Sequence, residues 1–325
     1  MPETQKGTSL WADAFVRLKK NKLALLGGIT VIGILVACYI LAPLLSFFGY
    51  DATTQDLARR FAGPSGDTLL GTDQLGRDLL MRILEGGQIS LLVALIATSL
   101  TVTFGIIYGG IAGYVGGKTE TIMMRIVDGL LAMPFLIIVI LFRELISAKV
   151  EVYNHSFLNF YQENFDPSPE ALSGMVDTVL RFSNLIPLIF AIAAFGWLTM
   201  GRIVRSSAAS LRRQEFVEAA RSLGLSHRRI LFRHILPNML GPIIIYATLT
   251  IPSFILYEAT LSFIGLGIQP PNSSWGILIK EGAFFLETKP FILLYPALLF
   301  SLTLFAFNFL GDGLRDALDP KASKD

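Results

Sequence analysis

The chain has 325 residues, of which 53% are hydrophobic and 16% are charged. This composition is too apolar for an ordinary soluble domain, and the charged residues gather between long apolar runs. The net charge of +2 says little about partners, and a single cysteine, Cys38, excludes an intramolecular disulfide and a Cys/His metal cluster.

The amino-terminal part of the chain predicts a retained membrane span. Residues 1–22 are polar and basic, and an apolar run follows at 23–48. The run is too long for the apolar region of a cleaved signal peptide, and no small-residue cleavage site follows it cleanly. We therefore expect a polar segment at 1–22 and a first span at 23–48.

Five further apolar runs predict an all-α polytopic membrane protein with six transmembrane helices. The runs lie at about 89–114, 128–142, 185–200, 239–264 and 291–310. Together with the first run they give a transmembrane region over 23–320, and a polar tail follows at 321–325.

Two of these runs carry residues that bear on helix packing. Glycines recur along the second run, at Gly105, Gly109, Gly110 and Gly113. Small residues at such spacings let two helices approach closely in lipid. At the start of the third run, Arg125 and Asp128 stand three residues apart, so they can face each other on a helix at the membrane boundary.

The polar stretch between the first two runs contains the motif LGTDQLGRD at positions 70–78. Its candidate residues are Gly71, Thr72, Asp73, Leu75, Gly76, Arg77 and Asp78, and Arg82 follows. The glycines indicate turns, and the charged side chains can pair locally. From the residues alone, a solvated loop is the simpler interpretation.

A polar insertion at 143–184 separates the third and fourth runs. It carries three basic residues against six acidic residues. We expect a variable surface loop there, with a lid or a docking surface for a partner as the alternative. The insertion contains His155 without a second histidine or cysteine nearby, so no metal site is expected.

The segment 214–238 reads QEFVEAARSLGLSHRRILFRHILPN and lies between two apolar runs. It predicts a helix, a tight turn and a second helix. Gly224 suits the left-handed end of the first helix. Ser226 can cap the second helix, which we expect to run to Leu236 and to meet Pro237.

The distribution of basic residues predicts the orientation in the membrane. Residues 201–234 carry eight arginines against two glutamates, whereas the insertion at 143–184 is acidic. The positive-inside rule therefore places 201–238 in the cytoplasm and the insertion outside. Six spans then leave both termini on the cytoplasmic side, and the basic amino terminus agrees.

The segment 214–238 resembles the EAA loop in the permease subunits of bacterial ABC importers. The family's pattern is matched by Glu218, Ala219, Ala220, Gly224, Leu236 and Pro237, with His234 at the position of an isoleucine. The LGTDQLGRD motif and the segments 124–134 and 258–276 resemble the dipeptide and oligopeptide branch, in its second-permease (C-type) form. The resemblance covers about 23–320, except for the insertion.

The resemblance implies a permease subunit of a bacterial inner-membrane importer, with di- or oligopeptides as cargo. The sequence has no GxxxxGK[ST] phosphate-binding loop, so ATP and Mg²⁺ are expected on a partner ATPase, with no catalytic residue, metal or cofactor in this chain. The implied partners are a homologous second permease, one or two ATP-binding subunits, an extracytoplasmic substrate-binding protein and the lipid bilayer.

The resemblance also implies roles for residues of the EAA loop, whose first helix would enter a cleft of the ATPase. Ala219 and Ala220 keep one face of that helix thin. Glu215 and Glu218 offer charge partners, and Gly224 permits a sharp exit.

Two further assignments concern the opposite side of the membrane. The motif at 70–78 is expected to order the outer end of the second span. Glu258 lies near the far end of the fifth run, where a carboxylate is a candidate for the translocation path or for an interface with a partner subunit. The alternative for Glu258 is interfacial burial or pairing with a partner subunit.

Three other classes of protein share some of these sequence features. A helix–turn–helix with eight arginines can bind DNA, but its place between two spans argues against a nucleic acid partner. A membrane enzyme would need a nucleophile–base or metal constellation, which three histidines and one cysteine do not provide at motif spacing. An ATP-independent secondary transporter is the main alternative, although no inverted repeat is obvious.

Overall fold

The computed structural model describes residues 10–165, 167–269 and 272–318, which form an all-α fold without strands. The predicted fold class is confirmed, while residues 1–9 and the predicted tail at 321–325 lie outside the described residues. The helices are α1 (Leu10–Lys20), α2 (Lys22–Val36), the π-helix η1 (Ala37–Leu41), α3 (Ala42–Phe47), the 3₁₀-helix η2 (Leu57–Arg59), α4 (Leu79–Val115), α5 (Gly117–Leu131), α6 (Phe135–Phe165), α7 (Pro169–Leu211), α8 (Glu215–Ser222), α9 (His227–Ile230), the π-helix η3 (Leu231–Ile235), α10 (Leu236–Phe263), α11 (Trp275–Ala283) and α12 (Phe291–Leu318).

Within the described residues, five helical segments are long and apolar enough to cross a membrane, and a sixth is obtained if the bent pair α5 and α6 is counted as one span. The five are Lys22–Phe47, α4, α7, His227–Phe263 and α12. This agrees with the six predicted spans, of which the third is the broken one.

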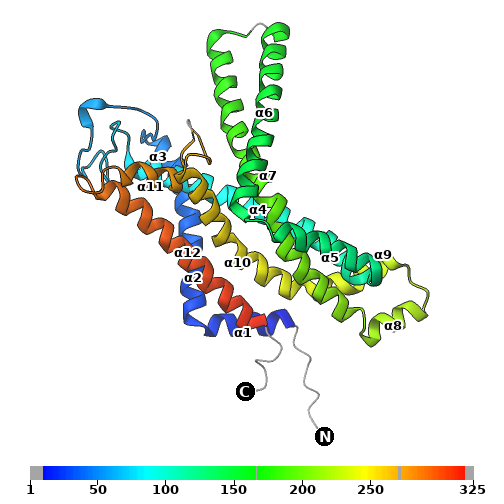
Figure 1. Cartoon of the computed structure of the whole chain (residues 1–325). Helices are drawn as coiled ribbons and strands as arrows, with labels where there is room; N and C mark the ends of the chain where they lie inside the picture. The colour runs from blue at the N-terminus through cyan, green and yellow to red at the C-terminus, as the bar shows by residue number, and fades with distance from the viewer. Residues whose placement is uncertain (1–9, 166, 270–271, 319–325) are drawn as a thin grey trace.

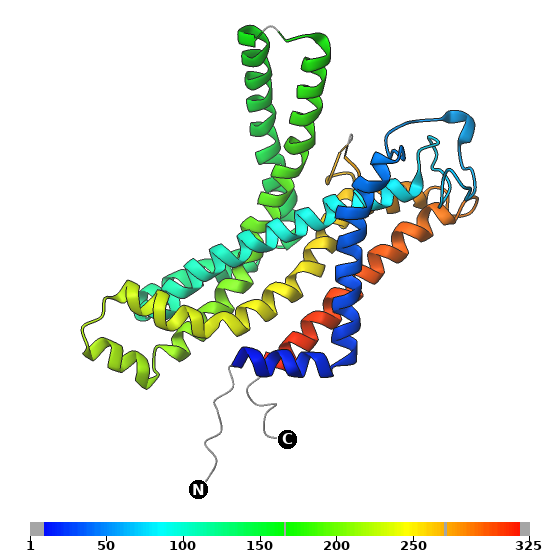
Figure 2. The ribbon, with the colours of Figure 1, turned by 180° about the vertical axis from the view of Figure 1, so that it is seen from behind.

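The elements gather at two opposite ends of the molecule (Figure 1). The helices α1, α8 and α9 and the last turns of α12 lie toward one end, which we call the α8 end. The helices α3 and α11 and the loop after α3 lie at the other, the α11 end. The view from behind shows the same division, with a hairpin of α6 and α7 projecting past the α11 end (Figure 2).

The helices α4 and α7 pack closely because glycines line the contact. A Cβ atom at Gly105 would lie 2.3 Å from Cγ of Met200, and one at Gly109 would lie 2.3 Å from the carbonyl oxygen of Gly201. One at Gly113 would lie 2.4 Å from the carbonyl oxygen of Arg205. The close approach predicted from the glycine spacing is confirmed, and it brings backbone against backbone.

The predicted third span is not a straight helix. The chain bends by 92° between α5 and α6, and Pro134 lies at the break. Proline lacks an amide donor and disfavours helical geometry in the residue before it, here Met133. Arg125 and Asp128, which we expected to be able to face each other, both line one groove along α5, and Asp128 forms its ion pair with Arg202 of α7.

The insertion at 143–184 is a helical hairpin, so the expectation of a loop is wrong. The helix α6 continues to Phe165, and α7 begins at Pro169 with the Ser168 hydroxyl capping the amide of Ala171. Proline in the first turn and serine as the cap are a strong helix start that the sequence analysis overlooked. No described residue between 140 and 184 is buried, so the hairpin has no core of its own.

The buried apolar side chains form two clusters. The larger cluster draws mainly on α4, α7 and α10 and includes the fully buried Trp275 of α11. The smaller cluster lies at the α8 end and joins Val204 of α7 to Val217 of α8, Ile230 of α9 and Ile235 of η3. It therefore fastens the hairpin of α8 and α9 to the membrane-spanning helices.

Candidate coupling site

The helix α8 forms in the way that its sequence predicts. Glu215 and Glu218 lie in its first turn, where carboxylates oppose the positive end of the helix dipole. Gly224 follows with φ +74°, the left-handed conformation that stops a helix. The hydroxyl of Ser226 then caps α9 by accepting a hydrogen bond from the Arg229 amide at 3.4 Å. The predicted helix–turn–helix is therefore present.

The EAA triplet is divided between the two faces of α8. Ala220 is buried against the smaller apolar cluster beside Val217. Glu215, Glu218 and Ala219 are exposed on the opposite face. Only one of the two alanines therefore thins the outward face, whereas the other sets how closely α8 approaches the bundle.

Two large apolar side chains on the same segment were missed by the sequence analysis. Phe216 is 41% exposed, and Leu223, which follows the last turn of α8, is 81% exposed. They stand seven positions apart, about two helical turns, and this spacing in the sequence could have revealed them. The outward surface of α8 thus combines carboxylates with apolar side chains.

The second helix does not end at Leu236, which corrects one expectation. The chain passes from α9 through η3 directly into α10, and Pro237 lies in the first turn of α10. Proline is tolerated there because it directly follows the π-helix η3, where the regular α-helical hydrogen-bond pattern is already interrupted. The hairpin is therefore helically continuous with the fifth span.

The end of α4 holds the hairpin from the side. The hydroxyl of Tyr114 lies 2.9 Å from Nδ1 of His227 in α9. Nη1 of Arg212 donates hydrogen bonds to the carbonyl oxygens of Tyr114 at 3.1 Å and Val115 at 2.9 Å. These are terminal carbonyls of α4 without partners inside the helix, so Arg212 ties the end of α7 to the end of α4.

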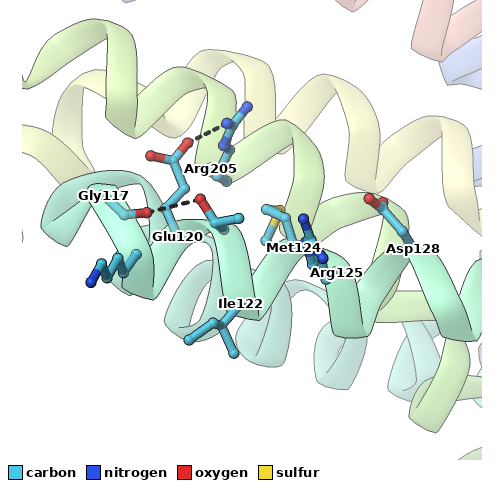
Figure 3. A pocket seen from close by; sticks show the side chains of 9 residues that line it. Gly117, Glu120, Ile122, Met124, Arg125, Asp128 and Arg205 are labelled. Atoms are coloured by element: carbon cyan, nitrogen blue, oxygen red, sulfur yellow. Dashed lines mark hydrogen bonds and ion pairs between the residues drawn. The ribbon is translucent and has the colours of Figure 1, made fainter.

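A groove of about 830 Å³ runs along α5 and borders α7 (Figure 3). Glu120 of α5 forms an ion pair with Arg205 of α7, and Asp128 near the other end of the groove pairs with Arg202. These two arginines are therefore neutralised by carboxylates of α5, and the pairs join the two helices across the groove.

The motif at 70–78 lies at the α11 end and depends on its glycines. Gly71 and Gly76 have φ values of +81° and +75°, which favour glycine. A Cβ atom at Gly76 would lie 1.8 Å from the carbonyl oxygen of Asp56, so no other residue fits there. Thr72 joins two segments of this loop by donating to the carbonyl of Arg59 and accepting from the Ala62 amide at 2.9 Å.

Asp73 is the centre of this motif and is 1% exposed. Its Oδ1 accepts hydrogen bonds from the amides of Leu75 at 2.7 Å and Arg77 at 3.0 Å. Its Oδ2 accepts from Nε of Arg77 at 2.7 Å and from Nη1 of Arg82 at 2.6 Å. The same Nη1 of Arg82 reaches Oε2 of Glu281 in α11 at 2.7 Å. The predicted local pairing is present, and it extends to α11.

The carboxylates of the motif titrate differently because their surroundings differ. Burial by itself would raise the pKa of Asp73, but the Arg82 guanidinium, the amides of Arg77 and Leu75 and the Arg77 charge together hold it below its usual value. Burial raises the pKa of Asp78, against hydrogen bonds from the amides that open α4. Asp78 caps α4 by accepting from the Met81 amide at 3.0 Å.

Glu258 of α10 lies inside the chain, with no exposed surface. Its two carboxylate oxygens accept hydrogen bonds from the hydroxyls of Ser90 in α4 and Ser262, both at 2.7 Å. The Ser90 hydroxyl also accepts from the amide of Trp275, which begins α11, at 3.3 Å. The carboxylate thus joins α4 and α10 next to the start of α11, and sequence reasoning gave no sign of these serine partners.

Long apolar helices with a charged hairpin held between two of them are typical of a multi-pass membrane protein. A sequence family described as "binding-protein-dependent transport system inner membrane component" matches residues 105–324. A second, described as "N-terminal TM domain of oligopeptide transport permease C", matches residues 9–64. The chain belongs to the family of binding-protein-dependent transport system inner membrane components, and the resemblance indicated by its motifs is confirmed.

Curated relatives extend over nearly the whole chain. The oligopeptide transport system permease protein OppC of Haemophilus influenzae is 42% identical over 97% of this chain and 90% of its own length. OppC of Escherichia coli (strain K12) is 43% identical over 97% of this chain and 93% of its own. The dipeptide transport system permease protein DppC of Bacillus subtilis is 38% identical over 95% and 85%. A secondary transporter is not favoured by these relatives.

Proposed function

We propose that this chain is one permease subunit of an ATP-driven importer of di- or oligopeptides, and that α8 couples a separate ATPase to the spans. The names of the relatives support the cargo class. The observation that supports the coupling role is that α8 is connected through short segments to a membrane-spanning helix on each side. The helix α8 follows α7 after a turn at 212–214 and leads through α9 and η3 into α10. A displacement of α8 is therefore passed to two spans.

The surface of α8 suits a protein cleft. Glu215, Glu218 and Ala219 face outward together with Phe216 and Leu223. Apolar side chains of this size gain most when a partner buries them, and the carboxylates select a cleft with a basic rim. ATP and Mg²⁺ belong to that partner in this proposal, and this chain itself carries out no reaction.

The proposed orientation places the α8 end in the cytoplasm. Eight arginines lie in residues 201–234, and α1 and the last turns of α12 lie toward the same end (Figure 1). Both termini are then cytoplasmic, in a bacterial inner membrane. A homologous second permease completes the path, one or two ATPase subunits bind the α8 end, and a substrate-binding protein delivers cargo to the α11 end.

Gly224 provides the test of coupling because a side chain would fit in the space around it but not in its backbone conformation. A Cβ atom there would meet nothing within 4 Å, so only the φ of +74° opposes a side chain. Gly224→Val should strain the turn by about 1–2 kcal/mol, whereas Gly224→Asn is the matched control because asparagine tolerates this conformation. We expect ATP hydrolysis without peptide uptake in proteoliposomes carrying the valine variant.

Both variants should insert into the membrane in normal amounts. Normal, ATP-dependent uptake by Gly224→Val would contradict the coupling role of α8. Uptake that continues without ATP in the wild-type protein would contradict the importer itself.

A further inference from the structure

A second pocket, of about 570 Å³, lies beside the hairpin where α4 and α7 end. Four of its lining residues are basic, namely Arg212, Arg221, Arg228 and His227. Among the described lining residues there is no carboxylate. This distinguishes the pocket from the groove along α5, where Glu120 and Asp128 neutralise the arginines of α7. The pocket thus keeps an uncompensated positive charge.

Three of the four basic side chains of this pocket contact other residues of the chain. Arg212 is fixed by the carbonyls at the end of α4, and the guanidinium carbon of Arg221 lies 5.6 Å from the ring centroid of Tyr114. The Tyr114 hydroxyl in turn contacts His227. The Arg228 side chain has neither a hydrogen bond nor an ion pair within the part of the chain that the structure describes. Its guanidinium therefore remains available to an anion, and its planar fork matches a phosphate.

The pocket also has an apolar lining. Ile111, Val115 and Leu231 contribute to it, and Ile111 is 40% and Val115 is 54% exposed. Ile111 and Val115 belong to the last turns of α4, a helix long and apolar enough to cross a membrane. A soluble phosphate would gain nothing from these apolar side chains, whereas an acyl chain would be buried against them.

We propose that this pocket binds an anionic phospholipid, with its phosphate among Arg212, Arg221 and Arg228 and the upper part of one acyl chain against Ile111 and Val115. A bound lipid would fill the space between the end of α4 and the hairpin. The proposal concerns neither the cargo nor the ATPase contact and does not depend on the proposed function.

The test uses the protein purified in mild detergent with whatever subunits accompany it. Native mass spectrometry would count the lipids retained after titration with phosphatidylglycerol or, as the zwitterionic comparison, phosphatidylcholine. We expect one tightly retained phosphatidylglycerol and no retained phosphatidylcholine. Arg228→Gln should weaken retention about fivefold, and Arg221→Gln with Arg228→Gln roughly thirtyfold, because each surface arginine contributes about 1 kcal/mol toward an anionic lipid.

Arg229→Gln is the matched control, since Arg229 lies on the same short helix and is exposed but does not line the pocket. It should retain phosphatidylglycerol as the wild-type protein does. Three results would each overturn the proposal. These are equal retention of phosphatidylcholine, an equal loss of phosphatidylglycerol in the Arg229 variant, and displacement of phosphatidylglycerol by inorganic phosphate or ATP at matched ionic strength.

Discussion

At the scale of single residues, Asp73 organises the α11 end. Its carboxylate is buried and bonded to two arginines, of which Arg82 has a side chain that is only 5% exposed. Removing one member of a buried ion pair leaves the other without compensation, which is far more costly than losing an exposed pair. The contact of Arg82 with Glu281 of α11 means that the motif also fixes the position of that helix.

Asp73→Asn should therefore lower the free energy of unfolding by about 3 kcal/mol, within the range for broken buried pairs. Asp67→Asn is the control, because Asp67 pairs with Arg59 on the surface, where both side chains are more than half exposed. The control should change stability by less than about 1 kcal/mol. Thermal unfolding in detergent measures both, and equal effects of the two substitutions would refute the structural role of Asp73.

The same carboxylate predicts a dependence on pH. The native pKa of Asp73 lies below its usual value of about 3.9, so the unfolded chain binds this proton more readily than the folded chain. Its contribution to stability is complete above about pH 5 and is lost as the pH falls through about 4 toward the native pKa. The stability difference between the wild-type protein and Asp73→Asn should shrink over that interval in unfolding curves recorded at successive pH values. A constant difference would contradict the assignment.

At the scale of elements, the contact between α4 and α7 shows why spacing alone does not identify every packed glycine. Gly109 and Gly110 are neighbours in one glycine-rich run, yet they point in different directions. A Cβ atom at Gly109 would press on the backbone of Gly201, whereas one at Gly110 would meet only Leu231, at 3.9 Å. The first glycine is needed for packing, and the second is not.

Gly109→Ala should consequently destabilise the protein by about 1–3 kcal/mol, because the two helix backbones must separate. Gly110→Ala should be neutral or stabilising by up to about 1 kcal/mol, since alanine favours the helix and finds room. Both variants replace glycine with alanine, at neighbouring positions, so their thermal unfolding midpoints can be compared directly. Equal midpoints would show that α4 and α7 pack differently from the geometry in Figure 1.

The sequence predicted helix ends and close helix packing better than it predicted contacts between segments that are distant along the chain. Gly224 and Ser226 act locally, through φ and a cap, so their neighbours in sequence reveal them. Glu281, by contrast, meets Arg82 across 199 positions, and Ser90 meets Glu258 across 168. Such partners are brought together by the topology of the bundle, which no local pattern contains.

At the scale of the whole molecule, the hairpin of α6 and α7 stands apart from the rest. Both views show it projecting past the α11 end (Figures 1 and 2). It buries no described residue between 140 and 184, and a hydrogen bond of 2.6 Å from Asn154 to Ser183 joins its two helices. The apolar clusters of the bundle are complete without it.

Replacing residues 156–180 with a short Gly-Ser linker should therefore leave insertion and the unfolding midpoint unchanged. The linker version keeps Asn154 and Ser183, so the base of the hairpin is preserved. The control replaces residues 51–75, a segment of the same length, with the same linker. It should prevent folding, because the motif packs against Asp56 in this segment. A large drop in midpoint for the hairpin variant would show that the bundle depends on it.

The length of the hairpin of α6 and α7 amplifies rotations at its base. From residue 142 to its tip it is about 35 Å long, since each helical residue adds about 1.5 Å. It is helical from base to tip, so a rotation of about 10° at its base would carry the tip through about 6 Å. The base of α7 belongs to the same unbroken helix that ends just before α8. A small movement of α7 within the bundle would thus produce a larger displacement at the tip of the hairpin. A spectroscopic label near residue 165 would detect that displacement.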